Sequence, residues 1–392
     1  MTEKLRVGLI FGGKSGEHEI SLASAQSVAR AIDKEKHAVT LIGITKEGRW
    51  LAGADVLTQL AAASPTPLLG FNAENSAASA AEAISGKELV PAAFDLLGNK
   101  SPLAAIDVAF PLVHGPFGED GTVQGLLELA DIPYVGAGVA ASAVGMDKAL
   151  MKAIFRASNL PAVDWTVVLR HERECSPEGA LNRIEGALGY PCFVKPANLG
   201  SSVGVTKVRN RDELAQALTT AAQYDRKLLA ERAVEDAREI ECSVLGNDEP
   251  IASLPGDVVP RREFYDYVAK YDDRAGTQLI VPADLPPETV HIVQSLAIRT
   301  FKAIDCCGMA RVDFFLERAT NKVFVNEINT IPGFTAVSMY PRMWEKSGLA
   351  YSALIDRLIQ LALERYADRK KSKTSYQQVC DWETTFDEAT HN

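Results

Sequence analysis

Apolar runs of strand length alternate with stretches of helical periodicity along most of the chain. Residues 6–11 form a short, mostly apolar run that is typical of a buried parallel strand, and Gly12 and Gly13 follow it as a turn. Residues 21–32 then predict a helix, and residues 37–44 predict the next strand. This strand–helix–strand order indicates an α/β protein that begins with a doubly wound, Rossmann-like unit.

Further apolar runs follow toward the C-terminus. They predict strands over residues 105–111, 133–135, 192–195, 206–208, 227–231 and 239–245. Helical periodicity predicts a helix that ends near residue 129 and helices over residues 136–158, 286–304 and 349–366. Two segments lack a clear pattern. Residues 54–99, rich in Ala, Ser and Pro, predict a surface segment with at least one helix, and residues 368–392 predict a polar tail.

The clearest pair of strands precedes a Pro-Gly turn. Residues 311–316 and 322–329 are rich in β-branched and aromatic side chains, and the short polar link between them predicts an antiparallel hairpin. Because side chains alternate faces along a strand, Arg311 and Asp313 are expected on one face. The same alternation predicts one shared face on the partner strand for Val323, Val325, Glu327 and Asn329.

At the open end of this hairpin, one cation and three oxygen-bearing side chains are expected to converge: Arg311, Asp313, Glu327 and Asn329. Oxygen ligands of this kind suit magnesium, which keeps several waters and shares its coordination shell with substrate phosphates. Arg311 would stabilise an anion beside the metal. The pattern alone leaves open a simpler interpretation, a polar sheet face with one ordinary arginine–carboxylate pair.

Three other places carry polar residues near strand or helix ends. Glu17 begins the first helix, where an acid also complements the helix dipole. His114 follows a strand, at the edge where open α/β sheets contact ligands, and a structural hydrogen bond is the alternative role. Residues 196–204 form a loop of small residues that could close over phosphates or be a plain hairpin turn. Neither a G-x-G-x-x-G nucleotide fingerprint nor a P-loop is present.

Composition narrows the class of protein. A chain of 392 residues with 47% hydrophobic residues can form two or three domains. The net charge of −10 argues against a nucleic-acid partner. Six cysteines without C-x-x-C spacing argue against a zinc site and a disulfide framework. No apolar stretch approaches the ~20 residues of a membrane span and the start has no signal-peptide layout, so the sequence predicts a soluble cytoplasmic protein without a membrane partner.

Eight motifs in order resemble the D-alanine–D-alanine ligase family of ATP-grasp enzymes. They read FGGKSGEHEISL, HGPFGEDGTVQGLLE, MDKALMK, FVKPANLGSSVGVTKV, REIECSVLG, FYDYVAKY, MARVDFFL and NEINTIPGFTAVSMYP. The resemblance covers the chain to about residue 366. It implies a three-domain ATP-grasp fold whose first domain is Rossmann-like. The expected divisions are residues 1–136, 137–234 and 235–367, followed by the tail 368–392.

The resemblance also implies a role for individual residues. Two magnesium ions, with manganese as an alternative, are expected on Asp313, Glu327 and Asn329, with Glu327 shared by both. Arg311 and the Gly333 amide would stabilise a developing oxyanion. The expected ATP contacts are Lys148, Lys195, Ser201, Ser202, Glu231, Arg232, Val234, Glu239, Lys270, Asn326 and Glu327. The expected amino-acid contacts are Glu17, His114, Lys270, Arg311 and Ser338, and Ser201 and Tyr271 would join Glu17 in a hydrogen-bonded set.

The activity implied by the resemblance is the ligation of two D-alanine molecules, for the peptidoglycan precursor, by an enzyme expected to be a homodimer. ATP would convert the first D-alanine to an acyl phosphate, and the amine of the second would attack it, releasing ADP and phosphate. Two alternatives are another ATP-grasp carboxylate–amine ligase, and a D-alanine–D-lactate ligase. A regulatory nucleotide-binding protein without turnover is a third, and the intact set around Arg311 speaks against it.

Overall fold

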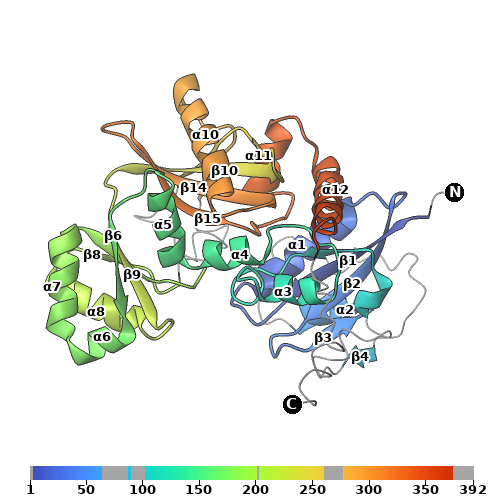
Figure 1. Ribbon diagram of the computed structural model, residues 1–392, viewed down its shortest axis with the longest axis horizontal. Helices are drawn as coiled ribbons and strands as arrows, with labels where there is room; N and C mark the ends of the chain where they lie inside the picture. The colour runs from blue at the N-terminus through green and yellow to red at the C-terminus, as the bar shows by residue number, and fades with distance from the viewer. Residues whose placement is uncertain (1–2, 64–86, 90–101, 201–202, 260–276, 374–392) are drawn as a thin grey trace, which may run out of the picture.

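The computed structural model describes residues 3–63, 87–89, 102–200, 203–259 and 277–373. Four of the predicted site residues lie outside this part of the chain: Ser201, Ser202, Lys270 and Tyr271. The described residues form three sheets, with helices packed on each (Figure 1). This arrangement confirms the α/β class predicted from the sequence.

The N-terminal sheet contains five strands in the order β4-β3-β2-β1-β5. Its strands are β1 Leu5–Gly12, β2 His37–Ile44, β3 Trp50–Ala52, β4 Lys87–Leu89 and β5 Val108–Pro111. Its helices are α1 His18–Ala31, α2 Val56–Ala62 and α3 Thr122–Leu129, with a 3-10 turn at Pro102–Ala105. Strand β1 pairs in parallel with both β2 and β5, which confirms the predicted Rossmann-like opening.

Two predictions for the segment after this sheet are wrong in detail. The strand expected at residues 133–135 is a single parallel bridge between Ala109 and Tyr134. The helix expected over residues 136–158 is two helices, α4 Val139–Met146 and α5 Lys148–Ala157. Asp147 separates them because its backbone is extended (φ −85°, ψ 97°) and its carboxylate accepts from the first amides of α5.

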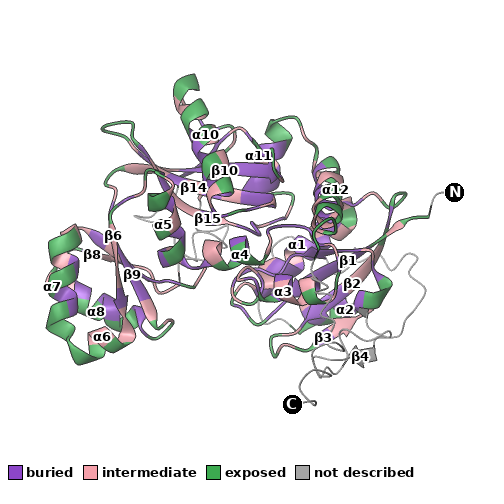
Figure 2. Cartoon of the chain, in the orientation of Figure 1, coloured by how far each residue is buried: buried purple, intermediate pink, exposed green. Residues whose placement is uncertain are grey.

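A four-stranded antiparallel sheet follows, in the order β6-β9-β7-β8. Its strands are β6 Trp165–Leu169, β7 Cys192–Pro196, β8 Thr206–Val208 and β9 Lys227–Arg232. Its helices are α6 Arg170–Cys175, α7 Pro177–Leu188 and α8 Arg211–Ala221. The strands expected near residues 192, 206 and 227 are confirmed. Figure 2 shows α7 and α8 exposed on their outward faces, and their apolar side chains fill the core of this unit.

The third sheet has six antiparallel strands, in the order β13-β12-β10-β14-β15, with β11 paired to β10. Its strands are β10 Ala237–Gly246, β11 Ile251–Ala252, β12 Gly256–Val259, β13 Gln278–Ile280, β14 Gly308–Glu317 and β15 Val323–Asn329. Its helices are α10 Pro287–Ala303, α11 Met339–Lys346 and α12 Tyr351–Arg369. Figure 1 shows α12 beside the N-terminal sheet, and Leu354 and Leu358 share one core with Val7, Phe11 and Phe110.

The predicted hairpin is present as β14 and β15, but its alternation is interrupted. Arg311 pairs with Asn329 and Asp313 with Glu327, and the register then shifts. The prediction that Val323 and Val325 share a face with Glu327 and Asn329 is wrong. Both valines lie in the hydrophobic core because the bulge adds one residue, Asn326, to β15 and reverses the alternation beyond it.

Helix α12 continues three residues beyond its predicted end at residue 366. Arg369 forms an ion pair with Glu128, and Lys370 forms one with Asp131, so this end of the helix is fastened to the N-terminal unit. The start of the predicted polar tail is therefore part of α12.

Five of the six cysteines lie in the described part of the chain, and all five are free thiols: Cys175, Cys192, Cys242, Cys306 and Cys307. Burial raises the pKa of the Cys192 thiol to about 11 and that of Cys242 to about 12. Among the described helices, none combines the length and the apolar character needed to cross a bilayer.

Candidate active site

The open end of the β14–β15 hairpin brings together the side chains that the sequence placed there. Arg311 donates from Nε to Asp313 Oδ1 and from Nη2 to Asp313 Oδ2, both over 2.7 Å. Asn329 Nδ2 donates to Asp313 Oδ2 over 3.0 Å. The bulge lies beyond these pairs. It therefore changes the face of the sheet on which Val323 and Val325 lie, but it does not disturb the polar cluster.

A second carboxylate, Glu241, contacts Arg311 from the neighbouring strand β10. Glu241 Oε2 lies 3.1 Å from Arg311 Nε, and Glu241 pairs with Asp313 in the sheet register. Burial would lower the pKa of the guanidinium, but Asp313 and Glu241 outweigh it and raise that pKa well above its ordinary value. Arg311 is therefore a permanent cation. Sequence reasoning missed Glu241, although the alternation of Glu239 and Glu241 along β10 was a signal for it.

Lys148 links the hairpin to the loop that follows β7. Its Nζ lies 3.6 Å from Glu327 Oε2 and donates to the Leu199 carbonyl over 2.9 Å. Its backbone amide donates to the Ala197 carbonyl over 3.0 Å. Because Lys148 is the first residue of α5, the break at Asp147 fixes where this ammonium lies.

The oxygen atoms at the hairpin end fit a magnesium site. No group of three or more His, Cys, Asp or Glu side chains is placed to hold a metal in the part of the chain that the structure describes. The oxygen set here is instead two carboxylates and an amide, from Asp313, Glu327 and Asn329. The Asn329 amide nitrogen is engaged by Asp313, which leaves its oxygen as the ligand atom. Beside them, Asn326 Oδ1 is buried without a hydrogen-bond partner among the described residues.

A buried group of charges lies between α5, β7 and β9. Lys195 Nζ donates to Glu231 Oε1 over 2.5 Å, and Lys152 Nζ lies 3.0 Å from Glu231 Oε2. Burial would raise the pKa of Glu231, but the two ammonium groups outweigh it and hold that pKa at about 2. Burial lowers the pKa of Lys152, whose side chain is fully enclosed. The group carries two cations and one anion, a charge balance that favours a phosphate nearby.

The other predicted nucleotide residues lie along the end of β9 and the start of β10. Glu231 is buried, whereas the next side chain, Arg232, is exposed. Arg232 Nε lies 3.7 Å from Asp164 Oδ2. Val234 and Glu239 are half-buried. Sequence reasoning did not assign Lys152 to the site.

Glu17 lies where two glycine-containing loops meet. It occupies the N-cap of α1. A Cβ built on Gly115 would lie 2.7 Å from Glu17 Oε2, and one built on Gly200 would lie 3.1 Å from the same atom. Gly115 also has a positive φ of 73°, so a side chain there would be both strained and crowded. The Glu17 carboxylate therefore adjoins Gly200, the residue before the predicted contact Ser201.

His114 is buried behind the Pro-Gly turn. Its Nδ1–H donates to the Ile331 carbonyl over 3.0 Å, and its Nε2 lies 3.1 Å from Ser24 Oγ. Burial would lower the pKa of the imidazole, but Glu119, whose Oε1 lies 3.7 Å from Nδ1, outweighs it and raises that pKa. His114 thus contacts the backbone two residues before Gly333. Its predicted contact with an amino-acid substrate stays a prediction.

Gly333 and Ser338 lie side by side after the hairpin. Ser338 is the N-cap of α11, and its Oγ accepts from the Thr335 amide over 3.1 Å. A Cβ built on Gly333 would approach Ser338 Oγ to 3.3 Å. The absence of a side chain at Gly333 therefore lets its backbone and the serine hydroxyl lie close together, and both residues are half-buried.

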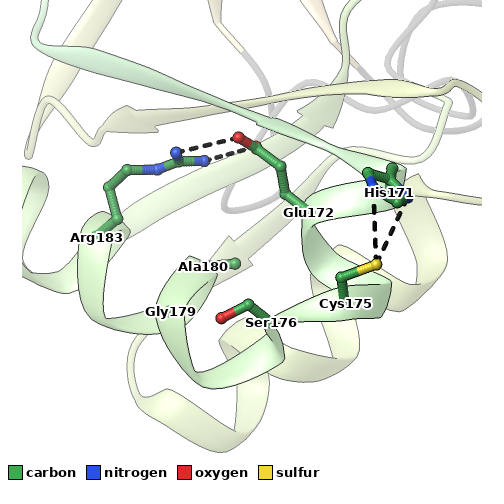
Figure 3. A pocket seen from close by; sticks show the side chains of 7 residues that line it. All are labelled: His171, Glu172, Cys175, Ser176, Gly179, Ala180 and Arg183. Atoms are coloured by element: carbon green, nitrogen blue, oxygen red, sulfur yellow. Dashed lines mark hydrogen bonds and ion pairs between the residues drawn. The ribbon is translucent and has the colours of Figure 1, made fainter.

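A shallow hollow lies elsewhere, between α6 and α7. Figure 3 shows its lining residues: His171, Glu172, Cys175, Ser176, Gly179, Ala180 and Arg183. Cys175 Sγ lies 3.6 Å from His171 Nδ1 on one side, and Arg183 pairs with Glu172 at 2.8 Å on the other. None of these residues belongs to the predicted set, so the candidate active site lies at the hairpin and not in this hollow.

Two family models match this chain. A family model described as D-ala D-ala ligase N-terminus matches residues 6–137, and one described as D-ala D-ala ligase C-terminus matches residues 154–360. A curated relative named D-alanine--D-alanine ligase, from Thermoanaerobacter sp. (strain X514), is 50% identical over 368 residues. That alignment covers 94% of this chain and 99% of the relative.

Solved structures give the same result. The D-alanine-D-alanine ligase from Coxiella burnetii is 38% identical, with a TM-score of 0.75, and the match covers 94% of this chain and 97% of that one. The VanG D-Ala:D-Ser ligase from Enterococcus faecalis is 32% identical, with a TM-score of 0.77, covering 92% of this chain and all of that one. These neighbours confirm the ATP-grasp fold with its N-terminal Rossmann-like unit. The chain belongs to the D-alanine–D-alanine ligase family.

Proposed function

We propose that this protein is an ADP-forming ligase that joins two D-alanine molecules for a peptidoglycan precursor. The names of its relatives support the reaction. The observation that carries the proposal is the meeting of charges at the hairpin end, where Lys148 approaches Glu327 within 3.6 Å and Arg311 holds Asp313 at 2.7 Å. This arrangement suits a triphosphate on one side and a developing anion on the other.

Two magnesium ions, or manganese in their place, would be held by Asp313, Glu327 and Asn329, with Glu327 shared. When bound, these metals supply positive charge for the transferring phosphoryl group. The protein's own residues hold the ligand atoms still, because Arg311 and Asn329 both donate to Asp313.

ATP would lie between the four-stranded and six-stranded sheets. Its phosphates would meet Lys148 and Lys195, together with Ser201, Ser202, Lys270 and Asn326. Glu231, Arg232 and Val234 would border the adenine, and Glu239 the ribose. The net positive charge of the Lys152–Glu231–Lys195 group supports this placement.

The first D-alanine would bind with its ammonium at Glu17 and near His114, and ATP would phosphorylate its carboxylate. The amine of the second D-alanine, whose carboxylate would bind at Ser338 with Lys270 nearby, would then attack the acyl phosphate. Arg311 and the Gly333 amide would stabilise the tetrahedral anion, and phosphate would leave. Arg311 can serve two carboxylates and this anion together because guanidinium has five N–H donors.

Water must be kept from the acyl phosphate, because hydrolysis would waste ATP. The contact between Glu17 and Gly200 supports a closing role for the loop after β7, with Ser201 and Tyr271 joined to Glu17. These two residues lie outside the described part of the chain, and their roles stay predictions.

Four further expectations belong to the same proposal. The functional units would be residues 1–136, 137–234 and 235–367, with α12 extending the last unit to Arg369. The enzyme would act in the cytoplasm, where ATP is available, and would be a homodimer. Neither nucleic acid nor a membrane would be a partner.

The proposal is tested by coupled ADP release with D-alanine, L-alanine, D-serine and D-lactate, each supplied as the acceptor beside D-alanine. We expect one D-alanyl-D-alanine per ADP, no dipeptide that contains L-alanine, and little mixed product with D-serine or D-lactate. D-Serine is included because one structural neighbour is a D-Ala:D-Ser ligase. A preference for D-serine or D-lactate over D-alanine would contradict the proposed acceptor, and ADP release without D-alanine would contradict the reaction.

A further inference from the structure

The loop that joins β15 to α11, residues 330–338, carries both Gly333 and Ser338; we call it the acceptor loop. Two of its backbone amides donate to serine hydroxyls of α1, in the N-terminal unit. The Phe334 amide donates to Ser24 Oγ over 3.4 Å, and the Ala336 amide donates to Ser27 Oγ over 3.0 Å. Because the two serines are three residues apart, they lie on one face of α1 and contact the loop together.

The carbonyl groups of the acceptor loop are held from the same side. Tyr351, the first residue of α12, donates its hydroxyl to the Phe334 carbonyl over 2.6 Å and lies 3.2 Å from Ser27 Oγ. His114 donates to the Ile331 carbonyl over 3.0 Å, and its other ring nitrogen contacts Ser24. The loop is therefore tied to the N-terminal unit both before and after Gly333.

Aromatic packing adds to these hydrogen bonds. The Phe334 side chain is fully buried, and its ring lies 5.6 Å from that of Phe110 on β5 and 5.7 Å from that of Tyr351, between ring centroids. Ser24 is also fully buried, so its hydroxyl contacts protein groups and not solvent. The Phe334 amide, which donates to this buried hydroxyl, therefore has a defined position.

Helix α1 also begins at the candidate site. Its N-cap is Glu17, the residue proposed to hold the first amino acid. At 1.5 Å per residue, Ser24 and Ser27 follow Glu17 along the helix axis by about 10 and 15 Å. One rigid element thus connects the carboxylate for the first amino acid with the loop that would hold the second. Reaction between two bound molecules needs their reacting atoms within a few tenths of an ångström of the productive distance.

We propose that Ser24 and Ser27 are positioning residues for the second amino acid, acting through the Phe334 and Ala336 amides of the acceptor loop. Helix α1 sets the spacing between the two amino-acid subsites, and the serines transmit it to Gly333 and Ser338. The inference rests on the proposed function of these two loop residues. It adds two side chains that touch neither substrate and that no motif of the sequence singled out.

The test compares Ser27→Ala and Ser24→Ala with Ser27→Thr, which keeps a hydroxyl. Alanine favours a helix, so the alanine variants are expected to fold, and thermal melting checks this. The matched control is Ser142→Ala, because Ser142 is a fully buried helical serine whose hydroxyl has no hydrogen-bond partner among the described residues. Steady-state rates over a wide range of D-alanine concentration give separate KM values for the two amino-acid subsites.

We expect Ser27→Ala to raise the KM of the second subsite about three- to tenfold, the effect of losing one hydrogen bond, and to leave the KM of ATP unchanged. Ser27→Thr restores the KM of the second subsite toward that of the parent. We expect Ser24→Ala to raise the ratio of ADP to dipeptide, because a displaced Gly333 amide leaves more acyl phosphate to water. Ser142→Ala is expected to match the parent in every measurement.

An active parent whose Ser27→Ala and Ser24→Ala variants keep the KM of the second subsite and the ADP-to-dipeptide ratio overturns the inference alone. Equal losses for ATP and both subsites also overturn it, because they indicate general damage to the fold. A parent that forms no dipeptide overturns the proposed function, and the inference with it.

Discussion

Replacing Glu231 by glutamine tests whether the buried charges of the nucleotide site are held as the structure shows. The change keeps the shape of the side chain but removes the anion shared by Lys152 and Lys195. Two ammonium groups, one fully buried and one 7% exposed, then face each other without a carboxylate. We expect Glu231→Gln to lower the free energy of unfolding.

The size of the effect follows from the pKa of Glu231. That pKa falls from 4.5 to about 2 in the folded protein, and at about 1.4 kcal/mol per pH unit the difference corresponds to about 3 kcal/mol. Loss of one partner from a buried pair costs about 3–5 kcal/mol, which agrees. Since the folded pKa is depressed, this stabilisation is fully present above pH 4.5. It is lost as the pH falls from about 4.5 to about 2.

Urea denaturation at pH 7 measures the decrease in the free energy of unfolding. The double variant Glu231→Gln, Lys152→Met removes one cation along with the anion, and we expect it to recover at least half of the lost stability. The control is Glu172→Gln, because Glu172 forms an exposed pair with Arg183 at 2.8 Å, and such pairs contribute under about 1 kcal/mol. A loss for Glu231→Gln no larger than that of the control would refute the reasoning.

Three further predictions concern the reaction. Glu327→Gln should abolish turnover and leave the melting temperature within a few degrees of the parent; near-normal dipeptide synthesis at saturating magnesium would contradict the metal assignment. Ser338→Ala should weaken binding of the second D-alanine by about 1.5–3 kcal/mol, or about 10- to 150-fold in its KM, with ATP much less affected; equal losses in steady-state kinetics would disprove its role. Tyr271→Phe should increase the product formed with D-lactate relative to D-alanine, most at low pH where the free amine is scarce; an unchanged ester-to-amide ratio across pH would leave Tyr271 without a role in acceptor choice.

The hairpin shows what the alternation of side chains along a strand can predict and what it cannot. Alternation along β14 placed Arg311 and Asp313 together correctly, because strand periodicity depends only on neighbouring residues. The same rule failed for Val323 and Val325, since nothing in the sequence marks Asn326 as an extra residue. The break between α4 and α5 at Asp147 was easier to predict from the sequence, because aspartate is a common N-cap. The Ala-rich segment around it nevertheless favoured one long helix.

The contacts that sequence reasoning missed are all between distant segments. Lys152 on α5 and Glu231 on β9 form a buried ion pair across a long separation in the chain, and neither residue indicates the other in the sequence. Ser24 and Ser27 belong to the small-residue face of a helix, and only the fold brings the acceptor loop to them. Motif resemblance assigned the conserved chemistry of the family to this chain, but it carried no information about these supporting contacts.

The most direct test of the proposed reaction follows one oxygen atom. The protein is incubated with ATP, magnesium and D-alanine labelled with ¹⁸O in its carboxyl group, and the inorganic phosphate is analysed by mass spectrometry. If the carboxylate of the first D-alanine attacks ATP and the second amine then displaces phosphate, one labelled oxygen per dipeptide is found in the phosphate. Phosphate without label, or AMP in place of ADP, would contradict the acyl-phosphate mechanism.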